Sequence, residues 1–183
     1  SFQYKERSEN KRQEFLDYID KLEPHNLVYI DETGIDDNEY YEYVWSSIGN
    51  RFYEKKPAYR KNRLSVVGAL NQKKFFAPLI FEGTCTKEVF EKWLKEILIP
   101  ELKPNQVVIL DNAAFHTAID IEALLKSKNC SVKYLPTYSP DMNPIEQHWF
   151  CIKNRVRKML QSTTDGLLNV LCNVLNEMRT SMC

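Results

Sequence analysis

The chain is poor in glycine and in long apolar runs, and each shortage excludes a class of protein. Only five of its 183 residues are glycine, and no GxxxxGK(S/T) phosphate-binding loop occurs. No apolar run approaches the roughly 18 residues needed to cross a bilayer, so the chain by itself is not a membrane protein. The N-terminal residues also lack the apolar core of a signal peptide. With 43% hydrophobic and 27% charged residues, the composition is that of one soluble globular domain.

The cysteines show no pattern of pairing. There are five, scattered along the chain without a CxxC motif, which argues against a disulfide framework and favours a reducing compartment. We therefore expect an intracellular protein, located in the cytoplasm or nucleoid if its source is a bacterium.

Net charge gives no direct sign of nucleic-acid binding, because Lys+Arg and Asp+Glu are equal at 25 each. The charge is nevertheless unevenly distributed. Residues 51–63 carry six basic side chains against one acidic, and residues 153–158 carry four more basic side chains. A single basic run is usually a solvated face, but two of them beside an acidic site favour a cationic patch for a phosphate backbone.

The hydrophobic pattern predicts an α/β protein. Apolar and β-branched runs predict strands over residues 27–30, 64–70, 75–81, 106–110 and 131–135, and residues 43–48 can form a further strand. Helical periodicity predicts helices over residues 5–22, 86–100, 117–126, 144–161 and 164–180. A meander followed by βαβ units predicts a mixed five-stranded sheet flanked by helices.

This pattern also predicts how the chain is divided. We expect a helical lead-in over residues 1–26, a catalytic core over residues 27–162 and a C-terminal amphipathic helix over residues 163–183. The apolar stripe of that last helix can pack on the core or on a second subunit, and packing on the core is favoured.

Three acidic residues stand at the predicted ends of regular elements. Asp31 follows the predicted strand over residues 27–30, and Asp111 follows the one over residues 106–110. Glu146 lies in the first turn of the predicted helix over residues 144–161. If the two strands are parallel neighbours, their acids lie side by side at the carboxyl edge of the sheet, where ligand sites gather. The helix can then place Glu146 over the same spot.

Each of these acids also has a purely structural interpretation. Asp31 begins an Asp-Glu-Thr-Gly stretch that suits a turn, and Asp111 with Asn112 can form an Asx turn. Asn143, followed by Pro144 and then by Glu146 three residues after it, has the pattern of a capping box.

Taken together, however, the acids favour a divalent-cation site. Clustered carboxylates repel one another unless a cation neutralises them, and hard cations such as Mg²⁺ prefer oxygen ligands. Two such ions about 4 Å apart promote in-line displacement at phosphorus. No reactive thiolate, Ser-His pair or glycine-rich phosphate loop competes for a catalytic role. The sequence therefore predicts phosphoryl-transfer chemistry.

Three segments resemble the signature blocks of a known enzyme family. Residues 31–34 (DETG), 111–116 (DNAAFH) and 136–146 (PTYSPDMNPIE) resemble those of DDE transposases, in particular the mariner-like superfamily and related bacterial insertion-sequence enzymes. The 34 positions between Asp111 and Glu146 match the spacing of that group, as do Trp149 and Lys153 on the following helix. The resemblance extends over roughly residues 4–158.

The resemblance implies a ribonuclease-H-like, retroviral-integrase-like catalytic core that depends on Mg²⁺, with Mn²⁺ as a substitute. It identifies Asp31, Asp111 and Glu146 as the catalytic, metal-binding acids. Asn112, His116 and Asn143 are then supporting residues of the site. The implied reaction is hydrolysis at the ends of a mobile DNA element, followed by attack of the freed 3′-hydroxyl on target DNA.

DNA is accordingly the expected partner, both as transposon ends and as target. Two sets of basic side chains are expected to contact its phosphates, one in the loop before the strand at residue 64 and one on the Glu146 helix. They are Lys55, Lys56, Arg60, Lys61 and Arg63 in the loop, and Lys153 and Arg157 on the helix.

The same resemblance implies further partners. Transposases of this group self-associate in a transpososome and carry helix-turn-helix domains, for which this chain has no room. We therefore expect an isolated catalytic domain whose DNA-binding module precedes it in a longer protein or resides on a separate chain, as in a split reading frame.

Two alternative functions remain open. The chain could be a catalytically inactive or domesticated derivative that only binds DNA, although the presence of all three acids argues against it. It could also be a ribonuclease-H-like nuclease for another substrate, such as RNA–DNA hybrids, although the long block ending at Glu146 favours transposition.

Overall fold

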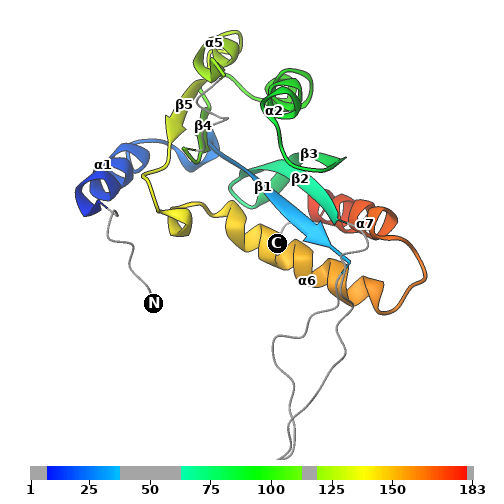
Figure 1. The fold of residues 1–183 in the computed structure, drawn as a ribbon. Coiled ribbons are helices and arrows are strands. Elements are labelled where there is room, and N and C mark those ends of the chain that lie inside the picture. Colours follow the sequence, from blue (N-terminus) through cyan, green and yellow to red (C-terminus); the bar gives the residue numbers. More distant parts are fainter. Residues whose placement is uncertain (1–7, 38–62, 113–118, 181–183) are drawn as a thin grey trace, which may run out of the picture.

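A five-stranded mixed sheet forms the centre of the molecule. The computed structural model describes residues 8–37, 63–112 and 119–180. The strands follow the order β3-β2-β1-β4-β5 across the sheet (Figure 1). They are β1 (Leu27–Asp36), β2 (Arg63–Asn71), β3 (Lys74–Glu82), β4 (Val107–Leu110) and β5 (Ser131–Tyr134). The first three are antiparallel neighbours, whereas β4 pairs in parallel with both β1 and β5. The predicted mixed sheet is confirmed.

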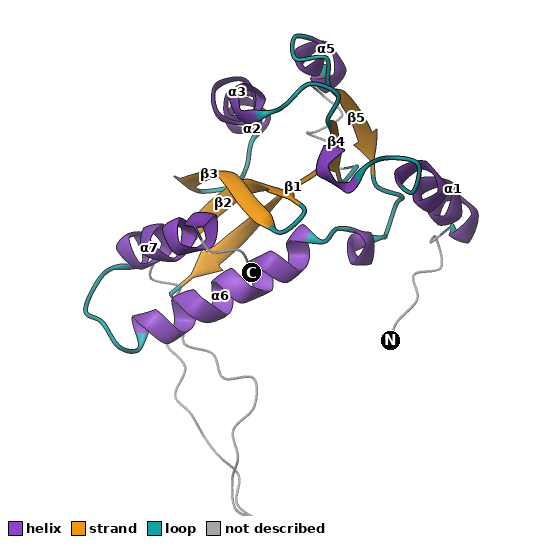
Figure 2. Cartoon of the chain, turned by 180° about the vertical axis from the view of Figure 1, so that it is seen from behind, coloured by secondary structure: helices purple, strands orange, loops and turns teal. Residues whose placement is uncertain are grey.

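Helices cover both faces of this sheet. They are α1 (Glu9–Ile19), η1 (Pro24–Asn26), α2 (Lys87–Trp93), η2 (Leu94–Leu98), α3 (Ile99–Glu101), α5 (Ile121–Lys126), η3 (Pro140–Met142), α6 (Ile145–Leu160) and α7 (Leu167–Thr180). Figures 1 and 2 show α6 and α7 against one side of the sheet, and α2 and α5 beyond the other. Within the described ranges, no helix is both long and apolar enough to span a membrane.

The alternation of side chains along β1 separates two apolar cores. Val28 and Ile30 point to the face covered by α2, η2 and α5, and they belong to that cluster. Ile35 points to the opposite face and belongs to the cluster that α6 and α7 form with β2 and β3, while Tyr29 packs against the same cluster. Asp31 has the parity of Tyr29 and Ile35, so its side chain lies on the α6 face.

Helix α7 packs on the rest of this domain through its apolar stripe. Its buried side chains share one cluster with Ile152 and Val156 of α6 and with residues of β2 and β3. They are Leu167, Val170, Leu171, Val174, Leu175 and Met178. Burial of six such side chains accounts for a stable docking of the C-terminal helix against the sheet.

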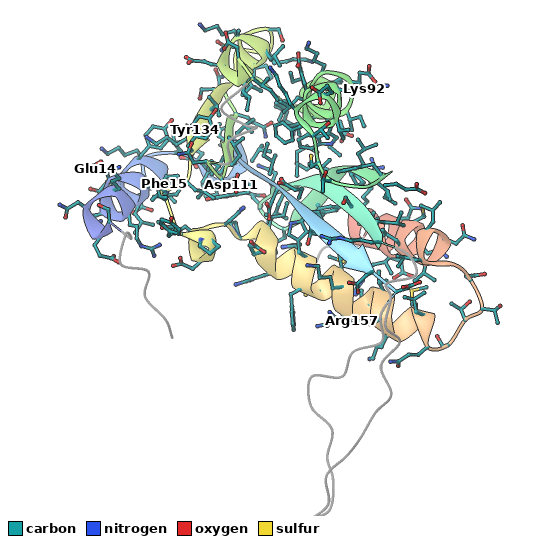
Figure 3. All side chains as sticks on the ribbon, in the orientation of Figure 1. Glu14, Phe15, Lys92, Asp111, Tyr134 and Arg157 are labelled. Carbon is teal, nitrogen blue, oxygen red and sulfur yellow. The ribbon has the colours of Figure 1, made fainter. Side chains whose placement is uncertain are left out.

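Helix α1 is attached to the opposite end of the sheet. Phe15 is 2% exposed and packs with Val107, Ile109 and Leu135 (Figure 3). On the same helix, Arg12 donates to Asp141 in η3 through two nitrogens, at 3.0 Å and 2.7 Å. Helix α1 therefore braces the segment that precedes the Glu146 helix.

Several predicted boundaries are wrong by a few residues, each for an identifiable reason. Strand β1 extends to Asp36 because β2 continues to pair with it along that length. Helix α5 begins at Ile121, where the Asp120 side chain accepts the N–H of Ala123 at 3.0 Å. Pro100 does not end its helix but lies in the turn over Ile99–Glu101. The predicted strand over 43–48 lies outside the described residues.

The predicted strands over residues 64–70 and 75–81 form a hairpin with a connection shorter than the four residues between those ranges. Only Gln72 and Lys73 join β2 to β3, and Gln72 adopts the left-handed conformation with φ 55°. The pairing of β2 with β3 shifts register between Val67 and Ala69. Gly68 lies at this irregularity, directly opposite Asp31 of β1.

Candidate active site

Asp31 lies in the middle of a strand. The prediction that a strand ends at this residue is wrong, and so is its interpretation as a turn, because Asp31, Glu32 and Thr33 all pair with residues of β2. The side chain is partly buried beneath α6. A position inside a paired strand gives this carboxylate a firmer support than a turn would.

Asp111 reaches the same cavity as Asp31 because β1 and β4 are parallel neighbours. The last paired positions are Tyr29 and Ile109, and each acid follows two residues later, Asp31 within β1 and Asp111 just after the end of β4. Strand β4 itself ends at Leu110, as predicted. The Leu135 N–H donates to the Leu110 carbonyl at 2.8 Å, so the chain leaving β5 also passes next to Asp111.

Glu146 is supplied by the first turn of α6. The predicted capping box does not form, since α6 begins at Ile145 with no side-chain cap. Instead the Glu146 N–H donates to the backbone carbonyl of Asn143 at 3.2 Å. The side chain of Asn143 therefore does not cap the helix, and its Oδ1 is buried without a hydrogen-bond partner.

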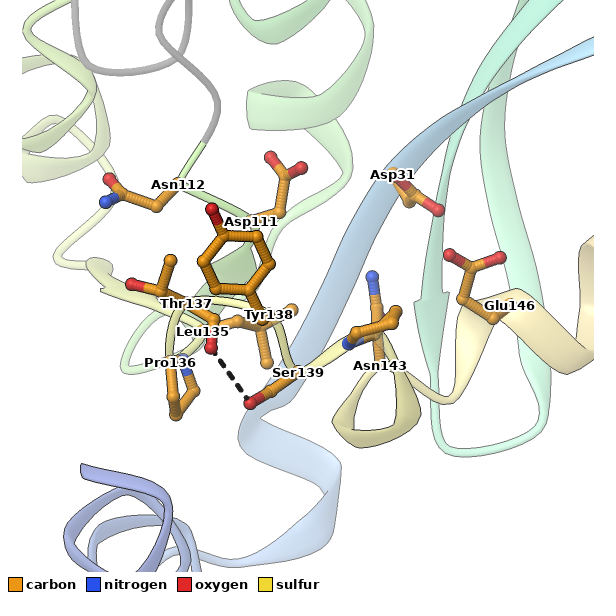
Figure 4. Close-up of a pocket in the computed structure, with 11 residues that line it drawn as sticks. Asp31, Asp111, Asn112, Leu135, Pro136, Thr137, Tyr138, Ser139, Asn143 and Glu146 are labelled. Carbon is orange, nitrogen blue, oxygen red and sulfur yellow. Dashed lines mark hydrogen bonds between the residues drawn. The ribbon is translucent and has the colours of Figure 1, made fainter. Parts of the chain in front are cut away.

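One cavity of about 360 Å³ collects these side chains (Figure 4). Its lining includes five residues that the sequence indicated, namely Asp31, Asp111, Glu146, Asn112 and Asn143. Residues 135–140, which connect β5 to η3, form the remaining wall. His116 lies outside the described residues.

Tyr138 in this wall has an unusual backbone. It adopts a positive φ of 57°, a conformation that is unfavourable for a non-glycine residue, and the residue is 46% exposed at the cavity. The adjacent Ser139 is buried and its hydroxyl donates to the Thr137 carbonyl at 3.4 Å. The sequence placed these residues in a signature block without indicating a role for them in the site, although strain of this kind is concentrated at functional sites.

The electrostatics of the cavity disfavour a negative charge on Asp31. Burial, with the nearby carboxylates of Glu32 and Glu146, raises the pKa of Asp31 to about 8. Two donors act in the opposite direction, the Glu32 backbone and the Trp149 indole N–H. Clustered acids of this kind become favourable as anions when a cation lies among them.

The donor set of the cavity fits a hard divalent cation. Its charged groups are all carboxylates, and the buried Oδ1 of Asn143 adds a neutral oxygen without a donor. In Figure 4 the side chains of Asp31 and Glu146 face one another, while Asp111 lies across the cavity from them. As placed, no three His, Cys, Asp or Glu side chains of the described ranges are grouped closely enough to hold an ion.

Asp141, the other acid of the signature segment, has a different role. It lies outside the cavity lining and binds Arg12. Asp141 and Glu146 therefore have different roles although they are only five positions apart: Asp141 forms an ion pair, and Glu146 lines the cavity.

Of the predicted DNA-binding residues, three are described. Arg63 begins β2, and a Cβ added at Gly34 would lie 2.6 Å from its guanidinium, so Arg63 lies over β1. Lys153 and Arg157 follow Glu146 by seven and eleven residues on α6, which places them along the same face of the helix. Figure 3 shows Arg157 towards the far end of α6. The remaining four, Lys55, Lys56, Arg60 and Lys61, lie outside the described residues.

Sequence reasoning missed the part that Trp149 plays here. Trp93 and Trp149 are both core residues, with 0% and 2% exposure. The Trp149 indole N–H also donates to Asp31 Oδ2 at 3.0 Å. The spacing of three residues from Glu146 is the signal that could have found it, since it places both side chains on neighbouring positions of one helix.

Comparison with known families identifies the class of protein. The family model described as DDE superfamily endonuclease matches residues 26–167. Because this match covers most of the chain, the protein belongs to the DDE superfamily endonucleases. Membership indicates a phosphoryl-transfer enzyme with a transposase-like catalytic domain. No curated protein matches the chain significantly.

Solved structures confirm the fold. The Mos1 strand transfer complex has a TM-score of 0.63 with 18% identity, covering 93% of this chain and 57% of that chain. The Mos1 transposase catalytic domain with Raltegravir and Mn has a TM-score of 0.56 with 15% identity, covering 98% and 92%. The catalytic core of BIV integrase has a TM-score of 0.55 with 15% identity, covering 84% and 82%. The predicted ribonuclease-H-like, integrase-like fold is therefore confirmed.

The lengths of these relatives differ. The chain spans only 58% of the Mos1 chain in the pre-cleavage transpososome, but nearly the whole of the isolated Mos1 catalytic domain. Structures of Mos1 paired-end complexes have been solved with Mn and with Mg.

Proposed function

We propose that this chain is the catalytic domain of a cut-and-paste transposase, which cleaves DNA at transposon ends and joins the ends to target DNA. The observation that carries the proposal is the meeting of Asp31, Asp111 and Glu146, from three separate elements, at one cavity. The relatives of known structure support it, because Mos1 complexes include a paired-end complex and a strand transfer complex.

In this proposal Asp31, Asp111 and Glu146 hold Mg²⁺, with Mn²⁺ as a substitute. When bound, the ions supply charge that activates an attacking oxygen and stabilises a leaving one at phosphorus. The all-oxygen donor set of the cavity supports this choice of metal, and so does the solution of Mos1 complexes with Mg and Mn. Because Asp111 lies across the cavity from Asp31 and Glu146, its approach to the ions is part of the formation of the active complex.

Two successive displacements at phosphorus account for the reaction. In the first, the oxygen of water attacks a phosphodiester at the element end, the P–O3′ bond breaks and a 3′-hydroxyl is released. In the second, that hydroxyl loses its proton and attacks a phosphodiester of the target, whose own 3′-oxygen leaves. One ester is broken for each ester formed in this second step, so no external energy source is required.

The protein contributes rigid supports and cationic contacts. Asp31 is held inside a paired strand, and Glu146 on a helix whose apolar side is buried, so both keep their places while DNA enters. Asn112 and Asn143 line the cavity, where their amides can orient a phosphate or an acid. Lys153, Arg157 and Arg63 extend from the site and bind DNA phosphates without reading bases.

The wider assembly is proposed on the same basis. The active form is a self-associated complex with two transposon ends, and a helix-turn-helix module, in the same protein or on another chain, recognises the terminal repeats. Lys55, Lys56, Arg60 and Lys61, which the sequence indicated for DNA contact, and His116, which it indicated for support of the site, keep these roles as proposals.

The test is cleavage and joining of labelled duplexes that carry the element's own ends, taken from the DNA flanking its coding sequence. We expect strand cleavage only with Mg²⁺ or Mn²⁺, and at least a 1,000-fold loss in Asp111→Asn and Glu146→Gln, in the range seen when essential catalytic groups are removed. Glu122→Gln is the matched control, because Glu122 also lies in the first turn of a helix but outside the cavity lining. Equal activity in all four proteins would contradict the assignment, and cleavage of RNA–DNA hybrids alone would support a different nuclease.

A further inference from the structure

A hydrogen bond connects the helix that carries Glu146 to the strand that carries Asp31. The indole N–H of Trp149 donates to Oδ2 of Asp31 at 3.0 Å, across 118 positions of sequence. Trp149 is 2% exposed, so water does not compete for this donor. Such a hydrogen bond imposes a direction on the carboxyl group, and it becomes stronger when the acid is ionised beside a cation.

The surrounding side chains hold the indole in place. The Phe75 ring meets it edge-on, with centroids 5.3 Å apart and planes at 77°. Gly68 lies opposite Asp31 on β2, and a Cβ there would stand 2.5 Å from Cζ of Phe75 and 3.3 Å from Cη2 of Trp149. The absence of a side chain at residue 68 is therefore what allows both rings to lie beneath the acid.

This arrangement relates two acids that come from different layers of the fold. Trp149 follows Glu146 by three residues, so one turn of α6 supplies both an acid to the cavity and a donor to Asp31. A shift of α6 along the sheet would break the hydrogen bond and move Glu146 in the same step. The bond thus couples the position of Glu146 to the orientation of Asp31.

We propose that Trp149 is a positioning residue of the metal site: its indole N–H orients the Asp31 carboxylate and fixes helix α6 so that Asp31 and Glu146 present their oxygens to the same ion. The inference rests on the proposed function, in which these acids bind the metal. It assigns to Trp149 a role beyond core packing, and it names Gly68 and Phe75 as the residues that make that role possible.

The test removes the N–H and keeps the ring. Trp149 is replaced by benzothienylalanine, which has the shape of tryptophan but no N–H, and in a second variant by Phe. The matched control is Trp93→Phe, because Trp93 is equally buried and its N–H donates to the Ala77 carbonyl at 2.8 Å, away from the cavity. Both Phe variants lose one indole and one hydrogen bond, so a purely structural role predicts the same behaviour for both.

The principal measurement is the affinity for Mn²⁺, followed as free Mn²⁺ by electron paramagnetic resonance with and without end-bearing DNA. We expect both Trp149 variants to bind Mn²⁺ about 10- to 100-fold more weakly, as removal of an outer hydrogen-bond partner does at other metal sites. Trp93→Phe is expected to keep the wild-type affinity. The cleavage rate of the Trp149 variants should recover at saturating metal, because the acids themselves remain.

A second measurement needs neither metal nor activity. The indole ¹H–¹⁵N resonance of Trp149 in metal-free protein is expected to shift in Asp31→Asn, while that of Trp93 stays in place. No shift at Trp149 would overturn the hydrogen bond on which the inference depends.

The outcomes separate this inference from the proposed function. If the wild type binds Mn²⁺ and cleaves DNA, and the benzothienylalanine variant does so with the same affinity, the positioning role is overturned and the function stands. If the wild type neither binds Mn²⁺ nor cleaves DNA, both are overturned.

Discussion

Asp31 and Asp111 each lie two residues beyond Tyr29 and Ile109, the last paired positions of the parallel neighbours β1 and β4. The register of β1 and β4 therefore decides that both acids line one cavity, although they are 80 positions apart in the sequence. Strand β1 continues well past Tyr29 while β4 ends at Leu110, which opens the space that the cavity and α6 occupy.

Metal binding is expected to stabilise the protein through these acids. A ligand that binds only the folded state at ten times its Kd adds roughly 1.4 kcal/mol to the free energy of unfolding. We therefore expect Mg²⁺ or Mn²⁺ to raise the Tm of the wild type by a few degrees and to leave Asp111→Asn unchanged. Differential scanning calorimetry over a metal titration measures this, and an equal rise in both proteins would mean that the ion binds elsewhere.

The metal-free protein is expected to lose stability as the pH rises. The pKa of Asp31 is about 8 in the folded state against an ordinary value of 3.8, so its contribution is fully present below about pH 4 and is lost as pH rises through about 8. Chemical denaturation in the presence of a chelator, compared at pH 5 and pH 8, should show a fall in the wild type that is larger than in Asp31→Asn. Parallel behaviour of the two proteins would show that Asp31 ionises normally.

Gly68→Ala is expected to destabilise the domain by about 1–3 kcal/mol, since the added methyl would overlap the Phe75 ring in a packed core. The same substitution should weaken Mn²⁺ binding, because Phe75 supports Trp149. Gly166→Ala serves as the control, as nothing lies within 4 Å of a Cβ at that position. Equilibrium unfolding and the Mn²⁺ titration together check this prediction, and a Gly68→Ala protein as stable as the Gly166→Ala protein would contradict it.

The pair of Arg12 and Asp141 is expected to contribute about 1 kcal/mol, at the upper end for ion pairs at a surface, because its geometry is bidentate. A double-mutant cycle with Arg12→Ala and Asp141→Asn measures this coupling. The exposed pair of Lys95 and Glu91, with a single contact at 2.6 Å, is the comparison and should couple less. If the two cycles give the same energy, α1 does not brace the segment before Glu146 through this pair.

The sequence alone was sufficient for the order and type of most elements. Buried strands such as β4 and the amphipathic helices α6 and α7 have strong local periodicities, and the β2–β3 hairpin has apolar runs on both sides of a polar turn. Boundaries were less predictable, because pairing with a neighbour decides where a strand such as β1 ends. A short sequence window holds no information on that neighbour.

The candidate site, like the fold, was predictable from the sequence only in part. The long block from residue 136 to Glu146, and the placement of Asp111 after an apolar strand, are visible in the sequence and were enough to indicate an acidic site. The capping box was the wrong interpretation of Asn143, because the helix begins one residue after Pro144 and its first turn bonds to a backbone carbonyl instead.

By itself, the sequence indicated the candidate site residues and the type of most elements, because residue type and local periodicity are properties of short segments. Only the tertiary structure decided that Asp31 lies inside a strand, that Asp141 pairs with Arg12, and that the Trp149 indole donates a hydrogen bond to Asp31. These relationships join segments 118 or more positions apart, or depend on strand register. They follow from the packing of α1 and α6 on the sheet, and no local pattern encodes that packing.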